Sequence, residues 1–498
     1  MRLDSAQLDR AVGALLASAV GDALGAGYEF GSAPYGGWPR MIGGGLGGFA
    51  PGEWTDDTAQ AVAIARVAAT GADLRSEGAL DAIAAGFAEW YSGGPSDVGI
   101  QTSAVLRRAG RDAMAVAMAE AAAFVHAQSG RSAGNGSLMR TAPVALAHLD
   151  DPVELVAAAK AVSSLTHHDP IAGEGAALWC LMIRHAILHG ELPAAEDVLP
   201  LLGETSHDWG AVLLEAENGK PARFHKNGWV VGALQAAWSA ILHTLEPQDQ
   251  PCRHLQEGLA TAIAIGNDTD TVAAIAGALL GARWGASAVP QEWQAPLHGW
   301  GVDGGAAALV VLATTTVQGG RTRGRSEWPL CERMDYRGYG GESTYVAHPL
   351  VDGVWIGGAL PLDDLPEHID AVVSLCRVGT KQVPDHVASH AVRLLDTVAE
   401  DNPNVDFVID DAARTVLRLR DEGKRVFLHC VAAHSRTPTV AARVGVLVGH
   451  DLGAALRAVV DALPSARPQR WLVQALRRLE QADRASIWSG DVDQRGLR

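Results

Sequence analysis

The sequence predicts a large all-α domain followed by a smaller α/β domain with a central, mainly parallel sheet. At 498 residues, the chain is longer than one hydrophobic core usually supports. From Ser5 to about Val317, apolar residues recur at helical spacing in Ala-, Leu- and Gly-rich runs. Later, short β-like runs alternate with helical stretches, which is typical of a parallel sheet. We expect domains at 1–317 and 346–485, a linker at 318–345 and a tail at 486–498.

The expected helices of the first domain follow from apolar periodicity. The clearest are 76–91, 151–165, 230–245 and 270–285. The apolar run from Ala11 to Val20 could resemble a signal peptide, but Asp4 and Asp9 precede it where basic residues would be expected, so we interpret it as a buried helix. No apolar run reaches the length needed to cross a bilayer. We therefore expect a soluble, cytoplasmic protein with no membrane partner.

A change of composition separates the two domains. The stretch from Gln318 to Tyr345 is rich in glycine, arginine and aromatic residues and has no period, as a linker would. After it, a helix is expected at 405–423, and β-like runs occupy 353–360, 371–378, 390–397 and 424–431.

Charge and cysteine content narrow the possible partners. The net charge of −17 argues against a stable nucleic-acid partner, because binding a phosphate backbone requires a basic face. The five cysteines are scattered and form no Cys-x-x-Cys pair. This pattern favours free thiols in a reducing cytoplasm over disulfides or a structural zinc site.

Two acidic segments stand at loop-to-helix junctions: "EWTDDTAQ" (Glu53 to Gln60) and "GNDTDTVAAIAGALLGA" (Gly266 to Ala282). Acidic residues and threonine can simply cap a helix start. Capping needs one oxygen, however, whereas four carboxylates brought together would repel one another unless cations lay between them. Ligands that are all oxygen suit Mg²⁺ or Mn²⁺. The four carboxylates are Asp56, Asp57, Asp268 and Asp270.

Five ordered motifs between about Leu8 and Val317 carry a family resemblance. They are "GALLASAVGDALGAGYEF", "WTDDTAQ", "SAGNGSLMRTAPVAL", "THHDP" and "GNDTDTVAAIAGALLGA". With these motifs the first domain resembles the ADP-ribosylglycohydrolase family, which includes ADP-ribosyl-acceptor hydrolases and dinitrogenase reductase-activating glycohydrolases. The resemblance implies hydrolysis of an ADP-ribosyl linkage, with an ADP-ribosylated protein or an ADP-ribose derivative as substrate.

The resemblance also implies roles for individual residues. Glu29 matches the family's mobile glutamate, which gates the metal site, and Asn267 stands where many members have a second glycine. The ADP-ribose site would be lined by Asn135, Gly136, Ser137 and His167. Two Mg²⁺ or Mn²⁺ ions would be held by Thr55, Asp56, Asp57, Asp268, Asp270 and Thr271.

A second site is expected in "VFLHCVAAHSRTP", from Val426 to Pro438. A strand delivers Cys430 to a loop before a helix with a proline in its first turn. Backbone N–H groups of such a loop, the helix N-terminus and Arg436 would stabilise a thiolate. The alternative is a buried structural cysteine near a surface arginine. The spacing of strand, cysteine, arginine and helix favours a nucleophile.

This loop resembles the phosphate-binding loop of cysteine-dependent protein phosphatases of the small dual-specificity type, over about Ala347 to Glu480. The resemblance implies that Cys430 forms a phosphocysteine, that Arg436 binds the phosphoryl group and that Thr437 helps the thiolate leave, with no cofactor. The general acid would be Asp396 or Asp401. Asp396 is favoured because it follows a strand-like run and precedes a hydroxyl residue. Ala433 departs from the glycine that is common in this loop.

The sequence thus predicts a bifunctional hydrolase. One activity would release ADP-ribose, and the other would act on a phosphorylated protein or a small-molecule phosphoester. In the alternative hypothesis, the C-terminal domain binds phosphorylated ligands without turnover. The acceptor atom, the phosphoester and the catalytic base of the first domain stay open.

Overall fold

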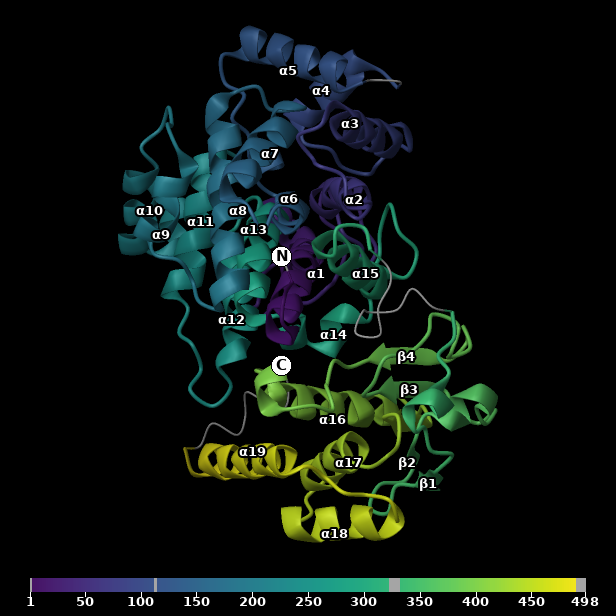
Figure 1. Ribbon diagram of the computed structural model, residues 1–498. Coiled ribbons are helices and arrows are strands. Elements are labelled where there is room, and N and C mark those ends of the chain that lie inside the picture. The colour runs from purple at the N-terminus through teal and green to yellow at the C-terminus, as the bar shows by residue number, and fades with distance from the viewer. Residues whose placement is uncertain (1, 112–113, 322–331, 490–498) are drawn as a thin grey trace. The chain divides into compact units, whose positions relative to one another are not determined.

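The computed structural model describes residues 2–111, 114–321 and 332–489 (Figure 1). The chain divides into two compact units. The first comprises Met1–Pro247, Cys252–Val289 and Trp293–Glu327, and the second comprises Gln248–Pro251, Pro290–Glu292 and Trp328–Arg498. Of the predicted linker, residues 322–331 lie outside the described residues, as do residues 490–498 of the predicted tail.

Helices account for the regular structure from Ser5 to Val317, and the described residues of this part form only isolated β-bridges. This agrees with the predicted all-α architecture. The helices are α1 Ser5–Gly25, α2 Asp56–Ala68, α3 Glu77–Ser92, α4 Ile100–Ala109, α5 Ala115–Ser129, α6 Ala142–Ala147, α7 Pro152–Ser164, α8 Pro170–His189, α9 Ala195–Leu202, α10 Trp209–Asn218, α11 Val230–His243, α12 His254–Ala264, α13 Thr269–Trp284, α14 Gln291–Gln294 and α15 Gly305–Val317.

Helix starts follow the capping signals in the sequence. The Ser76 hydroxyl accepts a hydrogen bond from the backbone N–H of Ala79 and caps α3. The Asp151 carboxylate accepts from Val153 and Glu154 and caps α7, with a proline in the first turn. The helices expected at 76–91, 151–165, 230–245 and 270–285 are therefore confirmed as α3, α7, α11 and α13.

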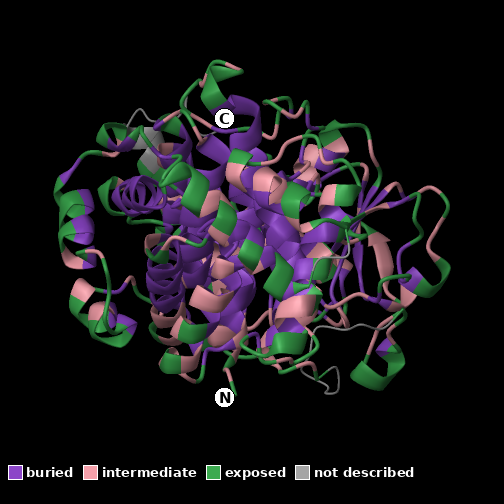
Figure 2. Ribbon diagram, turned by 90° about the horizontal axis from the view of Figure 1, so that it is seen from above, coloured by how far each residue is buried: buried purple, intermediate pink, exposed green. Residues whose placement is uncertain are grey.

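Helices α1 and α13 cross closely in the first unit. A Cβ added to Gly21 would overlap the carbonyl oxygen of Ala273, and one added to Gly277 would overlap that of Ala17. Glycine is therefore required on both helices for the backbones to come this near. Figure 2 shows buried residues filling the interior and exposed residues on the outer turns. The crossing brings the end of α1 to the start of α13.

One expectation about apolar length is wrong. Two helical segments, Ser5–Gly31 and Pro170–His189, are long and apolar enough to meet the criterion for a membrane span. Their most apolar stretches are 100% and 78% buried inside the protein. Mostly buried helices of this kind are also typical of a protein core, so length and composition alone are weak evidence for a membrane span.

The second unit contains a five-stranded mixed sheet in the order β1-β2-β5-β3-β4. β1 pairs antiparallel with β2, and the other three pairings are parallel. The strands are β1 Tyr345–Ala347, β2 Val354–Gly357, β3 Ala371–Ser374, β4 Ala388–Ala391 and β5 Val426–His429. The α/β prediction therefore describes this sheet, but the run expected as a strand at 390–397 leaves the sheet after Ala391.

Helices pack directly on the central strands of this sheet. α16 (Val405–Asp421) contacts β3 and β5, and α17 (Arg436–Leu447) contacts β2 and β5 (Figure 1). α18 (Leu452–Ala462) and α19 (Arg470–Ser489) pack beside them. Tyr336, from the stretch predicted as linker, is buried in the core of this unit with Phe427. The unit's packing therefore begins before residue 346.

Candidate functional site

Asp22 ties the end of α1 to the start of α2. Its buried carboxylate accepts hydrogen bonds from the backbone N–H of Thr55 at 3.0 Å and from the N–H and Oγ1 of Thr58 at 3.0 and 2.6 Å. Burial raises the pKa of Asp22, and these hydrogen bonds partly offset the rise. The sequence reasoning missed Asp22 as a site residue. A carboxylate inside an otherwise apolar buried helix was the available signal.

The start of α13 is not explained by capping. Asp268 occupies the N-cap position but makes no side-chain capping bond. Its Oδ2 instead accepts from Asn135 Nδ2 at 2.7 Å, and its backbone N–H donates to Asn227 Oδ1 at 3.3 Å. At α2, by contrast, the Thr55 hydroxyl is the N-cap acceptor, although its bond from the N–H of Asp57 is long at 3.5 Å. Capping therefore accounts for Thr55 and leaves the carboxylate of Asp268 for another role.

The two acidic segments meet in the folded chain. Two groups of three carboxylates have oxygens within 4.8 Å of one another: Asp22, Asp57 and Asp270, and Glu29, Asp268 and Asp270. Asp270 belongs to both groups. Thr55 Oγ1 and Thr271 Oγ1 both donate to Asp57 Oδ2, at 3.0 and 3.4 Å.

The acidic cluster, meaning these five carboxylates together with Asp56, has the chemistry of a divalent-cation site. Asp57 Oδ1 and Glu29 Oε2 are buried and accept no hydrogen bond from the described residues. A buried carboxylate oxygen without a partner is costly unless a cation or a proton neutralises it. The donors are all oxygens, which Mg²⁺ and Mn²⁺ prefer. The residues present therefore fit the cation that the sequence predicts.

In the absence of a cation, the cluster holds protons instead. Burial, followed by the charges of Asp268, Asp97 and Asp56, raises the pKa of Glu29 to about 8. Burial, followed by Asp97, raises the pKa of Asp56 to about 7. Burial also raises the pKa of Asp270 well above its usual range. Cation binding would replace these protons, so affinity should increase with pH.

Asp56 lies at the edge of the cluster and not within either group of three. Its Oδ2 accepts from Gln60 Nε2 at 3.2 Å and from the backbone N–H of Gly99 at 3.4 Å. Asp97, two residues before Gly99, is close enough to raise the pKa of both Asp56 and Glu29. The sequence reasoning missed Asp97, because a single loop aspartate carries no local signal.

The loop predicted to line an ADP-ribose site folds against His167. Asn135–Ser137 form a 3-10 turn, and a Cβ on Gly136 would lie 3.1 Å from His167 Cε1. Ser137 Oγ is buried and has no hydrogen-bond partner among the described residues, so it can serve a ligand. Asn135 Nδ2 also donates to the Asn227 carbonyl at 3.0 Å, which ties this loop to the segment before α11.

His167 is held as a neutral ring. Its Nδ1 lies 2.8 Å from Thr166 Oγ1, and burial, with a smaller contribution from Arg140, lowers its pKa to about 3. Arg140 donates to Thr166 Oγ1 at 2.7 Å and also to Gln60 Oε1. Arg140 and Asn227 are positioning residues that the sequence reasoning missed, because only the fold shows what they contact.

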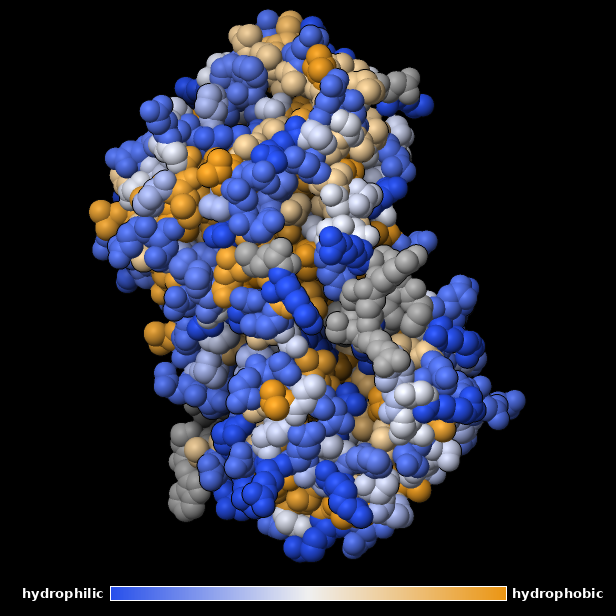
Figure 3. Space-filling model, viewed as in Figure 1, coloured by the Kyte–Doolittle hydropathy of each residue, from blue (hydrophilic) through white to orange (hydrophobic). Residues whose placement is uncertain are grey.

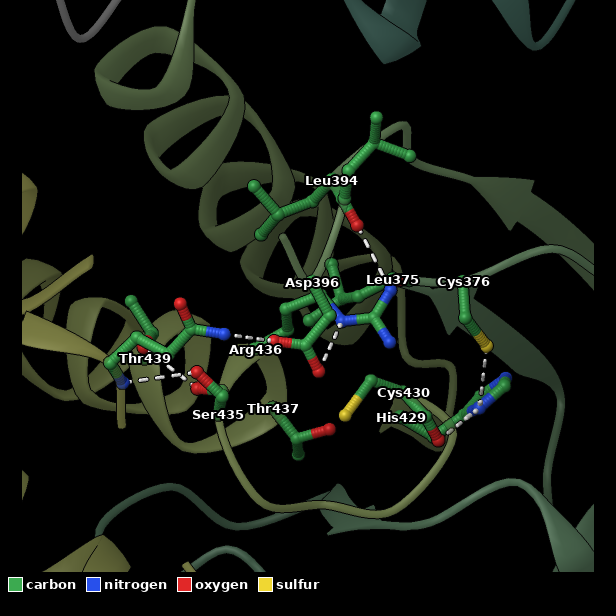
Figure 4. Close-up of polar contacts among 12 residues, drawn as sticks. Leu375, Cys376, Leu394, Asp396, His429, Cys430, Ser435, Arg436, Thr437 and Thr439 are labelled. Atoms are coloured by element: carbon green, nitrogen blue, oxygen red, sulfur yellow. Dashed lines mark hydrogen bonds and ion pairs between the residues drawn. The ribbon is translucent and has the colours of Figure 1, made fainter. Parts of the chain in front are cut away.

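In the second unit, β5 delivers Cys430 to a loop that ends at the first residue of α17. Cys430 is buried, and Ala433 has a φ of 55°. The position where glycine is common thus has a left-handed conformation here, and alanine carries its strain. Figure 4 shows Cys430 near the side chains of Arg436 and Thr437 at this junction.

Arg436 is fixed by carbonyl groups from the ends of two strand segments. Its Nη1 donates to Leu375 O at 2.7 Å and Leu394 O at 2.9 Å (Figure 4). Its Nε is buried without a hydrogen-bond partner among the described residues and lies 3.5 Å from Asp396 Oδ2. The guanidinium is therefore held in place with a donor left over for a phosphoryl oxygen.

The two candidates for the general acid differ in their contacts. Asp396 reaches Arg436 and also accepts from Gln469 Nε2 at 2.7 Å. Asp401 contributes its backbone carbonyl to Arg393 Nη1 at 3.2 Å. The structure thus brings Asp396 to the cysteine loop. Thr437, which was predicted to act beside Cys430 and Arg436, donates from its Oγ1 to Gly357 O at 3.1 Å.

Two neighbours of the cysteine loop escaped the sequence reasoning. His429 Nε2 lies 2.7 Å from Ser374 Oγ, and burial lowers the pKa of this histidine to about 4. Cys376 Sγ lies 3.9 Å from His429 Nδ1, and burial raises its pKa to about 12. Both groups are therefore neutral near pH 7 and support the loop by packing and hydrogen bonding.

Comparison with known proteins covers mainly the first unit. The family described as ADP-ribosylglycohydrolase matches residues 3–323. The ADP-ribosyl-[dinitrogen reductase] glycohydrolase of Rhodospirillum rubrum is 30% identical over 296 residues, which are 58% of this chain and 90% of that protein. The ADP-ribosylarginine hydrolase Tri1 of Pseudomonas putida (strain GB-1) is 31% identical over 299 residues, which are 57% of this chain and 73% of that protein.

Similarity in the second unit is structural and weak. The structure of human DUSP28 covers 29% of this chain and 99% of its own, with 20% sequence identity and a TM-score of 0.26. A score this low carries no argument about activity.

Proposed function

The chain belongs to the ADP-ribosylglycohydrolase family and is thus a hydrolase, and we propose that its first unit releases ADP-ribose from ADP-ribosylated arginine. The observation that carries the proposal is the convergence of two groups of carboxylates on Asp270. Relatives named as ADP-ribosylarginine hydrolases favour the arginine acceptor. An anionic, oxygen-lined site also suits a cationic guanidinium leaving group.

The proposed cation ligands are Asp57, Asp268, Asp270, Glu29 and Asp22, with Thr55 and Thr271 beside them. Bound Mg²⁺ or Mn²⁺ would polarise and orient the ribose hydroxyls next to the bond that breaks. The chain's own groups do the rest. Asn135 and Ser137 bind the substrate beside the cluster, and the buried Oε2 of Glu29, which has no hydrogen-bond partner among the described residues, is available to a cation.

Asp97 is the residue we propose for recognising the acceptor. It faces Glu29 and Asp56 closely enough to raise the pKa of both, so it stands beside the reacting region and outside the two groups of three. A carboxylate in this position can bind a guanidinium through two parallel hydrogen bonds. Asp97→Asn should therefore raise KM for ADP-ribosylarginine about tenfold and change kcat less.

The test is release of ADP-ribose from ADP-ribosylarginine, followed with Mg²⁺, with Mn²⁺ and after chelation. We expect activity with at least one cation, none after chelation and none in Asp270→Asn. The matched variant is Cys430→Ser, which should retain this activity because the cysteine loop belongs to the other unit. Undiminished activity after chelation or in Asp270→Asn would contradict the proposed site.

For the second unit we propose a cysteine-dependent phosphatase activity. The observation that favours it is the guanidinium of Arg436 beside the Cys430 loop, which two carbonyl groups hold in place and which pairs with Asp396 at 3.5 Å. The Cys430 thiolate would form a bond to phosphorus while the P–O ester bond breaks and the leaving oxygen takes the proton of Asp396. Water would then cleave the phosphocysteine, give its proton to Asp396 and release phosphate, assisted by Thr437.

Hydrolysis of para-nitrophenyl phosphate tests this activity. Variants of Asp396 and Asp401 compare the two candidates for the general acid. Cys430→Ser should abolish turnover. Asp396→Asn should lower kcat about 100-fold, whereas Asp401→Asn should lower it less than about twofold. If the wild type binds tungstate through Arg436 but never turns over the ester, the unit is a phosphate-binding module, as the alternative hypothesis states.

A further inference from the structure

Four large apolar side chains stand exposed beside the acidic cluster. Phe30 is 58% exposed, Ile42 43%, Leu46 60% and Ile100 93%, and we call these four residues the apolar rim. Hydrophilic side chains cover most of the face in Figure 3, and hydrophobic ones stand singly or in smaller groups among them. Single exposed apolar residues need no explanation, but four that adjoin one site do.

Phe30 and Leu46 both lie close to Glu29, which belongs to the acidic cluster. Phe30 follows Glu29 directly, and its backbone N–H donates to the carbonyl of Asn267, next to Asp268, at 2.7 Å. Its φ of 46° is left-handed, a conformation that is strained for a bulky residue and is usually kept for function. The backbone of Leu46 lies close enough to the Glu29 carboxylate to offset part of the rise in its pKa.

Glycine packing holds this part of the rim in place. Ile42 Cγ1 lies where a Cβ of Gly27 would be, and the carbonyl of Ala26 lies where a Cβ of Gly45 would be. Gly45 also has a φ of 66°. The Gly-rich loop is therefore packed on the backbone that carries Glu29, so the exposure of Ile42 and Leu46 is built into the fold.

Ile100 is connected to the same cluster through the residue before it. It is the first residue of α4, and the preceding Gly99 donates its backbone N–H to Asp56 Oδ2. Asp97 lies three residues before Ile100 and acts electrostatically on both Asp56 and Glu29. Exposed apolar side chains thus stand on separate segments of the chain that each contact the acidic cluster.

We propose that the apolar rim binds apolar side chains of a polypeptide on either side of its ADP-ribosylated arginine. This inference rests on the proposed ADP-ribosylarginine hydrolysis. A substrate protein would cover the exposed side chains on docking, and each well-covered side chain can contribute about a tenfold gain in affinity. The carboxylate of Asp97 matches the basic residue between them. A free ADP-ribosylated amino acid would leave the rim uncovered.

The experiment compares three probes with the full chain: free ADP-ribosylarginine, a peptide with one ADP-ribosylarginine between leucines, and the same peptide with serines in place of the leucines. We expect kcat/KM to be about tenfold higher for the leucine peptide than for the serine peptide. The double variant Ile42→Ser/Ile100→Ser should abolish this preference. Leu245→Ser, which alters an exposed apolar residue outside the apolar rim, should keep it.

Three other outcomes would contradict the proposal, and each has a distinct meaning. Equal kcat/KM for both peptides, or an unchanged preference in the double variant, would refute the rim as a docking surface. A dimer that becomes a monomer in the double variant would assign the rim to contacts between copies of this chain. If free ADP-ribosylarginine is not hydrolysed at all, it is the proposed function that fails.

Discussion

Asp57 uses only one of its two carboxylate oxygens within the chain. Thr55 and Thr271 donate to Oδ2, and Oδ1 is buried with no partner among the described residues. An unsatisfied buried acceptor costs about 1–3 kcal/mol, more if it is charged. Two threonines from separate helix starts thus orient one oxygen and leave the other for a ligand. The fold carries the cost of this arrangement until a ligand relieves it.

Ala433 carries strain that glycine would not. Its φ of 55° is unfavourable for any residue with a Cβ. Ala433→Gly should therefore stabilise the second unit by about 1 kcal/mol, measured by urea unfolding of the full chain. Ala432→Gly is the matched control, because Ala432 is not among the residues with positive φ and glycine there only adds unfolded-state entropy. Equal effects of the two substitutions would contradict the role of strain.

His429 should make the second unit sensitive to acid. Burial lowers its folded-state pKa to about 4, below the usual 6.5, so the unfolded chain binds a proton at a higher pH than the folded chain does. The stabilisation is complete above about pH 6.5 and is lost as the pH falls toward 4. At pH 5 the loss should be about 2 kcal/mol, seen as a lower urea midpoint.

A variant separates His429 from other titrating groups. His390, also buried, has a pKa lowered to about 4 and acts in the same direction. Replacing either histidine by glutamine should flatten the pH dependence between 6.5 and 5, and replacing both should flatten it further. A midpoint that falls as steeply in the double variant would assign the acid sensitivity to other groups.

At the scale of elements, the crossing of α1 and α13 determines the acidic cluster. Asp22 ends one helix and Asp270 begins the other, and glycines bring the two backbones together. Helix packing at such short range leaves no room for a side chain. The positions of these two carboxylates are therefore set in part by glycines beside them, since Gly21 precedes Asp22 and a Cβ on Gly25 would overlap the backbone of Asp270.

Gly277→Ala tests this dependence. The new Cβ would overlap the carbonyl of Ala17, so the helices must separate, and we expect a loss of roughly 3 kcal/mol or more together with weaker cation binding. Gly78→Ala in α3 is the control, because nothing lies within 4 Å of its Cβ position and alanine favours a helix by up to about 1 kcal/mol. Differential scanning calorimetry and Mn²⁺ titration measure the two effects.

The elements also show where sequence reasoning reached its limit. Long amphipathic helices such as α7 and α13 were predictable, because periodicity and caps are local signals. The end of the strand near residue 391 was not predictable. The apolar and polar residues of the run at 390–397 alternate as in a strand, but the chain leaves the sheet after Ala391. After the turn, the carbonyl of Leu394 accepts a hydrogen bond from Arg436, and the Asn402 side chain accepts one from the backbone N–H of Leu395. Contacts this distant in sequence leave no local pattern.

The same limit applies to the candidate site. The motifs identified Asp57, Asp268 and Asp270, which lie in the groups of three carboxylates. They did not identify Asp22, whose partners Thr55 and Thr58 follow more than thirty residues later in the chain. Only the fold shows that Asp22, buried in α1, accepts hydrogen bonds from the start of α2.

At the scale of the whole molecule, the two units present opposite chemistry to ligands. The first gathers carboxylates for cations, and the second aligns Arg436 and a loop for an oxyanion. Each ligand should therefore stabilise only one unit. Ligand at about 100 times its Kd adds about 2.7 kcal/mol to the unit that binds it.

Thermal unfolding of the full chain tests this independence. We expect two transitions, of which Mn²⁺ raises one midpoint and tungstate raises the other. Asp270→Asn should remove only the response to Mn²⁺, and Arg436→Lys only the response to tungstate. A single transition that both ligands shift equally would mean that the two units unfold as one.

The hydrogen bonds of Asp22 also bear on how this chain can evolve. They join the end of α1 to the start of α2, so the segment from Ala26 to Trp54 begins and ends at one fixed point. Exposed side chains on this surface excursion can change at little cost in stability, whereas the glycines that pack its backbone cannot. Phe30, Ile42 and Leu46 lie on this excursion. Substrate preference can therefore diverge between descendants of this chain while Asp57 and Asp270 keep their places.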